Sequence, residues 1–134
     1  MNNSGGETVI DLIQEVWGWS GIDPAEVVSV NAFGNLIVRD QGGAFWRICP
    51  EGVSCQVIAD SADAYANLLE DEEFLCDWQM TPLVQEARIR IGPLREGESY
   101  CFKNLPVIGG EYGGENLSKI SLRGLHAFWL IEDS

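Results

Sequence analysis

This sequence has few positively charged residues. Its 134 residues include eight lysines and arginines but twenty-one aspartates and glutamates, which gives a formal net charge of -13. Nucleic acids and anionic lipids carry dense negative charge, so such a chain repels both. It attracts basic partners and speeds their encounter. High net charge also keeps proteins soluble, and this simpler explanation stays open.

Histidine is nearly absent, and the four cysteines are not spaced as metal ligands. No two of Cys49, Cys55, Cys76 and Cys101 form a CxxC pair, and the only histidine, His126, lies far from all of them in the sequence. We therefore expect no zinc or iron–sulfur site, and no other metal or cofactor. The thiols are expected to be reduced and mostly buried.

Long apolar runs are also missing. No run approaches the roughly 20 residues that a membrane span needs, and no apolar signal segment follows the polar start of the chain. We therefore expect a cytoplasmic protein that binds neither membrane nor nucleic acid. Apolar residues still make up 46% of the sequence, which is ordinary for a globular protein.

No catalytic motif is recognisable. Gly109 and Gly114 have the glycine spacing of a phosphate-binding loop, but Glu115 and Asn116 follow where that loop needs lysine and serine or threonine. A glutamate there would repel phosphate, so these glycines predict a tight turn. His126 falls on the apolar stripe of a predicted helix and is expected to be structural. We expect no enzyme; a small hydrolase with an unrecognised carboxylate pair is an alternative.

Hydrophobic periodicity predicts a single α+β domain over residues 7–134, after a frayed start at residues 1–6. Apolar residues three and four apart predict a helix over residues 9–17. Four short β-rich runs between residues 27 and 58 are separated by turns, which predicts an antiparallel meander packed with several helices. The remaining predictions are helices that begin near residues 61, 74, 81 and 121 and strands at 99–102 and 117–120. Alternation at Ile89–Ile91 leaves the end of the third of these helices open.

The run Glu70, Asp71, Glu72 and Glu73 is the densest acidic segment. It lacks the alternating acids, central glycine and distal glutamate of a calcium-binding EF-hand loop. One interpretation is a solvated helix end or bend. The other is an acidic patch that meets the DNA-binding surface of a toxin, because spaced carboxylates imitate the charges that such a surface expects.

The C-terminal half carries an ordered series of motifs. It runs from Gly92-Pro93-Leu94 through Gly97-Glu98-Ser99-Tyr100-Cys101-Phe102 and Pro106-Val107-Ile108-Gly109-Gly110-Glu111-Tyr112 to Glu115-Asn116-Leu117. The series resembles the C-terminal domain of type VI secretion DNase-immunity proteins, which often follows a GAD-like domain for which this chain is too short. Such a resemblance implies a protein that binds and blocks a cognate nuclease toxin inside the producing cell.

We take the acidic run and the glycine-rich loop as candidate contacts with that toxin. The candidate partner-binding residues are Glu70, Asp71, Glu72, Glu73, Glu111, Tyr112 and Glu115. Trp19 or Trp78 is a candidate interface anchor, with burial in the core as the alternative. The competing function is an acidic adaptor or scaffold unrelated to toxins, and the oligomeric state stays open.

Overall fold

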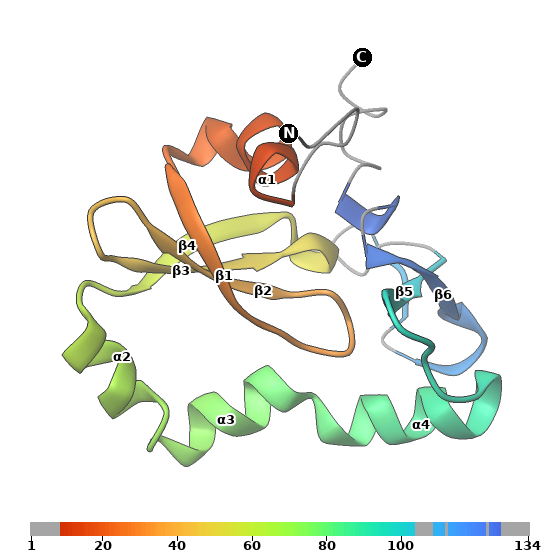
Figure 1. Cartoon of the computed structure of the whole chain (residues 1–134). Helices are drawn as coiled ribbons and strands as arrows, with labels where there is room; N and C mark the ends of the chain where they lie inside the picture. Colours follow the sequence, from red (N-terminus) through yellow and green to blue (C-terminus); the bar gives the residue numbers. More distant parts are fainter. Residues whose placement is uncertain (1–8, 104–108, 112, 123, 127–134) are drawn as a thin grey trace.

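The computed structural model describes residues 9–103, 109–111, 113–122 and 124–126. It confirms an α+β fold in which a four-stranded sheet, a two-stranded sheet and several helices pack together (Figure 1). The predicted limits at residues 6 and 134 lie outside the described residues and stay predictions.

The larger sheet is an antiparallel meander with the strand order β1-β2-β3-β4. Its register pairs Val38 with Val27 on one side and with Trp46 on the other. The turns between the strands are short, so each strand pairs with the next one along the chain, as the turn residues predict. The strands are β1 (Pro24–Val30), β2 (Leu36–Asp40), β3 (Phe45–Cys49) and β4 (Ser54–Ala59).

The first helix, α1 (Val9–Trp17), covers one face of this sheet (Figure 1). Its apolar stripe includes Leu12 and Ile13, which pack against Leu36 and Val38 of β2 in one buried cluster. Gly18–Ser20 continues as a short 3-10 turn, and Gly21 ends it with a φ of 92° that glycine adopts without steric cost.

Helices α2, α3 and α4 lie on the other side of the sheet (Figure 1). Alternation in β2 turns Ile37 toward this side, where it is buried with Phe45 and Trp78. The Ser61 hydroxyl caps α2 by accepting from the Ala64 N–H at 3.1 Å, which confirms the helix predicted to begin near residue 61. The helices are α2 (Ala62–Leu68), α3 (Glu72–Gln79) and α4 (Thr81–Ile91).

The alternation at residues 89–91 belongs to α4, which continues to Ile91. Ile89 is 85% exposed, so its apolar character does not mark a buried strand face. Trp78 is buried at 8% exposure, whereas Trp19 is 66% exposed. Of the two tryptophans considered as interface anchors, only Trp19 is therefore free to meet a partner.

The smaller sheet pairs β5 (Glu98–Phe102) with β6 (Leu117–Ser121) in antiparallel register. Its core is completed from outside, because Phe33 in the β1–β2 loop (residues 31–35) stacks on Phe102 with 5.2 Å between ring centroids. The Tyr100 N–H donates to the Ala32 carbonyl at 2.8 Å. The β1–β2 loop therefore joins the two sheets.

After β6 the chain turns into a helical segment that includes residues 124–126. The Ser121 hydroxyl accepts from the Gly124 N–H at 3.0 Å, as a helix cap does, and the helix is predicted to begin near residue 121. His126 is buried at 2% exposure. Its Nδ1 accepts from Trp17 Nε1 at 3.0 Å, so its Nε2 carries the hydrogen and donates to the Gly34 carbonyl at 2.9 Å.

Candidate functional site

The acidic run lies at the junction of α2 and α3, where all four of its residues are exposed. Asp71 caps α3: its carboxylate accepts from the Glu73 N–H at 2.9 Å and from the Phe74 N–H at 3.4 Å. Glu72 and Glu73 occupy the first turn of α3, where the helix dipole favours negative charge. The interpretation as a solvated helix end is therefore confirmed, and the same geometry displays four carboxylates outward.

This junction lies within an unusually long acidic stretch. No lysine or arginine occurs between Arg47 and Arg88, while nine acidic residues do. Asp60, Asp63 and Asp77 in this stretch are exposed as well. The surface built by α2 and α3 is consequently rich in carboxylates without interspersed cations from the same stretch.

The glycine-rich loop presents its acids at another place. Glu111 and Glu115 are exposed, and Tyr112 lies outside the described residues. The Gly114 N–H donates to a Glu86 carboxylate oxygen at 2.8 Å, which fastens the loop to α4. This hydrogen bond is the main cause of the lowered pKa of Glu86, and Arg90 adds to it.

The loop also confirms the tight turn expected from its glycines. Gly113 has a φ of 131°, and a Cβ on it would lie 2.6 Å from Glu86 Oε1. The Asn116 amide donates to the Glu111 carbonyl at 2.6 Å. Because the loop is held on α4 and the acidic run begins α3, the structure does not bring the two predicted groups into one cluster.

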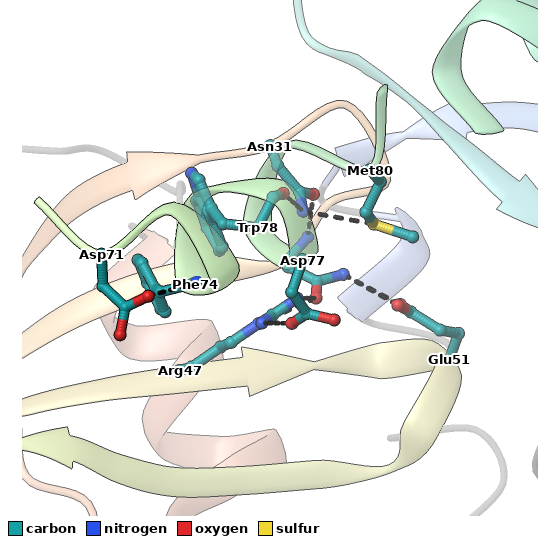
Figure 2. A network of polar contacts seen from close by, with 9 residues as sticks. Asn31, Arg47, Glu51, Asp71, Phe74, Asp77, Trp78 and Met80 are labelled. Carbon is teal, nitrogen blue, oxygen red and sulfur yellow. Dashed lines mark hydrogen bonds and ion pairs between the residues drawn. The ribbon is translucent and has the colours of Figure 1, made fainter. Parts of the chain in front are cut away.

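A polar network between the larger sheet and α3 was missed by the sequence analysis (Figure 2). Arg47 of β3 donates from Nη2 to Asn35 Oδ1 at 2.9 Å and from Nη1 to the Asp77 carboxylate. Its guanidinium carbon lies 5.3 Å from the centroid of the Trp78 ring. The Asn35 amide donates to Glu51 Oε1 at 2.9 Å. These contacts fix α3 on the sheet, since a guanidinium recognises both carboxylate and aromatic ring.

Beside this network lies a cleft of about 470 Å³ between α3 and the strands β3 and β4. Its lining combines the charged groups of Arg47, Glu51 and Asp77 with apolar atoms of Phe74 and Met80. A volume of several hundred Å³ with convergent polar groups is typical of sites that accept a side chain or small ligand.

The four thiols are unpaired, as expected, but the expectation that most of them are buried is wrong. All four are free, but only Cys55 is buried, Cys76 is exposed and the other two are intermediate. Burial, followed by the negative charge of Glu51, raises the pKa of Cys49 to about 12. That thiol therefore stays protonated near neutral pH and is a poor nucleophile. In the described part of the chain no group of three or more metal-binding side chains is assembled.

His126 is not placed as a catalytic base. Both ring nitrogens are already hydrogen-bonded, to Trp17 and to Gly34. Burial lowers its pKa, because charging the ring in this site has no compensating solvent. The prediction of a structural histidine is confirmed.

Among the described residues, no helix is both long and apolar enough to cross a membrane.

Fold and surface together define an acidic α+β domain with exposed carboxylates at the α2–α3 junction. The family whose model matches residues 59–129 is described as T6SS immunity protein Tdi1, C-terminal. This match covers more than half of the chain, so the chain belongs to this family of type VI secretion immunity proteins. Membership implies that the protein binds a cognate effector. Among curated proteins, none matches the sequence.

Proposed function

We propose that this protein binds a DNase effector in the cytoplasm of the producing cell and blocks the surface with which that enzyme holds DNA. The observation that carries the proposal is the row of exposed carboxylates at the α2–α3 junction, in a member of an immunity family. A nuclease must offer cations to the DNA backbone. Carboxylates displayed from a rigid helix end compete for those cations.

The predicted contact residues fall into two groups on this surface. Glu70, Asp71, Glu72 and Glu73 lie at one end of α3, and the loop with Glu111 and Glu115 is held on α4. Tyr112, the remaining predicted contact, lies outside the described residues. The eight residues of α3 extend over about 12 Å. A standard protein interface buries about 800 Å² on each partner. We propose that one nuclease meets both groups.

The first test is capture of the partner from the cells that make this protein. The captured protein is incubated with DNA, and the immunity protein is then added in increasing amounts. We expect cleavage to stop at a stoichiometric ratio, because blocking a surface needs one inhibitor for each enzyme. A partner that is no nuclease would refute the proposal and favour the acidic adaptor. Continued cleavage by a stable complex would refute blockage of the DNA-binding surface.

Charge reversal then tests the contact surface. The triple variant Glu70→Lys, Glu72→Lys and Glu73→Lys leaves Asp71 in place as the cap of α3. We expect association at low salt to slow by at least about tenfold, because electrostatic steering is lost. The matched control reverses three exposed acids elsewhere: Asp23→Lys, Glu26→Lys and Glu96→Lys.

The control has the same net charge as the test variant. It also removes the exposed Glu26–Arg39 ion pair, which contributes little to stability. If both variants slow association equally in stopped-flow measurements, net charge rather than the α2–α3 junction steers the encounter. The assignment of the acidic run as a contact would then be wrong, although neutralisation of a nuclease would still stand.

A further inference from the structure

Glu51 is an acidic residue whose surroundings are not those of the exposed acids. It lies in the 3-10 turn Pro50–Gly52 between β3 and β4 and is only 7% exposed. Its carboxylate accepts from the Asn35 amide at 2.9 and 3.2 Å, and the Cys49 thiol is its other polar neighbour. Both are neutral. Within the described ranges, no lysine, arginine or histidine forms an ion pair with it.

A buried carboxylate without a cation is costly, because neutral hydrogen bonds replace only part of its hydration. The nearest cation in the network, Arg47, is used elsewhere: it bonds Asn35 and Asp77 and lies over the Trp78 ring. Figure 2 shows Glu51 directed toward the network while Arg47 points to Asp77. The Glu51 carboxylate therefore lacks a cationic partner among the described residues.

The cleft described above gives a partner access to the Glu51 carboxylate. Glu51 and Asp77 line it together with Arg47, so its three charged groups carry one net negative charge. The Asp77 side chain is 72% exposed at the rim, and Arg47 is 16% exposed inside. Phe74 and Met80 supply apolar contact beside the carboxylates. One added cation with a flat, weakly hydrated head group would neutralise the cleft and use its apolar wall.

We propose that this cleft receives an arginine side chain of the effector, with its guanidinium on the Glu51 carboxylate and its stem against Phe74 and Met80. The inference rests on the proposed function for the identity of the partner, but the cleft itself is a guanidinium site in the isolated protein. Arginine fits better than lysine because its planar fork pairs with a carboxylate through two hydrogen bonds and tolerates partial desolvation.

The test uses Nα-acetyl-arginine methylamide as the probe and the intact protein, followed by nuclear magnetic resonance of the backbone amides. We expect shifts at Ser54 and Gln56, which line the cleft, with a dissociation constant on the order of 1 mM. The acetyl-citrulline methylamide analogue has the same shape without the charge and is expected to bind at least about tenfold more weakly. Equal shifts with both compounds would overturn the proposal.

Two variants and one control locate the binding. Glu51→Gln keeps an acceptor for Asn35 but removes the charge, and Gln56→Trp fills the cleft from an exposed strand position. Each is expected to weaken arginine binding by at least about tenfold. Glu96→Gln removes one exposed charge far along the chain and should leave binding unchanged. Unchanged binding in Gln56→Trp would overturn the cleft as the site, even if Glu51→Gln failed to fold.

The captured effector separates this inference from the proposed function. With the nuclease bound, Glu51→Gln should speed dissociation by about 30-fold, at low and high salt alike, because the pair is shielded from solvent. Dissociation unchanged by Glu51→Gln, with nuclease inhibition intact, would overturn the arginine site and leave the immunity function standing. If no nuclease is captured but the arginine probe still binds, the proposed immunity function is overturned and the arginine site stands.

Discussion

The region outside the family match, residues 9–58, and the region inside it build their cores differently. In the first, α1 and one face of the larger sheet bury Ile13, Leu36 and Ile48 together, while the other face packs on α2 and α3 of the matched region. In the second, the core of β5, β6 and α4 is completed by Phe33 from the β1–β2 loop. The smaller sheet and α4 therefore depend on the β1–β2 loop of the larger sheet for part of their core.

The same two regions differ in charge. Residues 1–87 contain fifteen acidic and two basic residues, whereas residues 88–134 contain six of each. The whole net charge of -13 thus belongs to residues 1–87. The family match over residues 59–129 includes part of the acidic region and most of the neutral one.

The largest effect is expected from breaking the connection between the regions at Phe33. Its ring is 1% exposed and contacts both Phe102 and Tyr100. Phe33→Ala should lower the free energy of unfolding by about 3–5 kcal/mol, measured by urea denaturation. Val30→Ala, at a 45% exposed position of the adjoining strand, is the control and should cost far less. Equal costs would mean that the smaller sheet does not depend on this loop.

A smaller effect is expected at the second connection, His126. His126→Leu deprives Trp17 Nε1 and the Gly34 carbonyl of this partner and should cost about 1–3 kcal/mol at pH 8. Because the folded pKa of His126 is lowered, the unfolded chain binds the proton first as pH falls. The histidine's contribution is thus complete above the unfolded value of 6.5 and is lost as pH falls from there through the folded pKa.

The gap in stability between wild type and His126→Leu should therefore narrow between pH 8 and pH 5. His126 is the only histidine, so no other imidazole contributes to the difference. Carboxylates titrate in both proteins and cancel in the comparison. A gap that stays constant across this range in thermal or urea unfolding would show that the protonated ring is tolerated in the folded state.

Much of the fold follows from local patterns. Turn residues such as those around Gly42 separate four β-rich runs, and neighbouring runs pair because their connections are short. Ser61 and Ser121 begin helices because their hydroxyls satisfy free N–H groups. Alternation misled at Ile89, where an exposed apolar side chain on α4 imitates the pattern of a strand.

The candidate site was predictable only in its exposed part. A dense run of acids is visible in the sequence, and Asp71 as a helix cap is a local effect. The network is not local: Asn35, Arg47 and Asp77 are separated by 12 and 30 positions and meet only when α3 packs on the sheet. Glu51 gave no signal, because burial of a single glutamate depends on tertiary contacts.

The smallest effect is expected at Glu86, which separates local positioning from global stability. Its carboxylate holds the Gly114 N–H and pairs with Arg90 one helical turn away. Glu86→Ala should raise the exchange rate of the Gly114 amide while leaving the unfolding midpoint almost unchanged, because exposed ion pairs contribute little.

Arg90→Ala is the control: it removes the ion pair but keeps the acceptor for Gly114, so amide exchange should stay slow. If Arg90→Ala accelerates exchange as much as Glu86→Ala does, then the ion pair and not the hydrogen bond fixes the loop. Faster exchange in Glu86→Ala alone would mean that the Glu86 hydrogen bond holds the glycine-rich loop on α4.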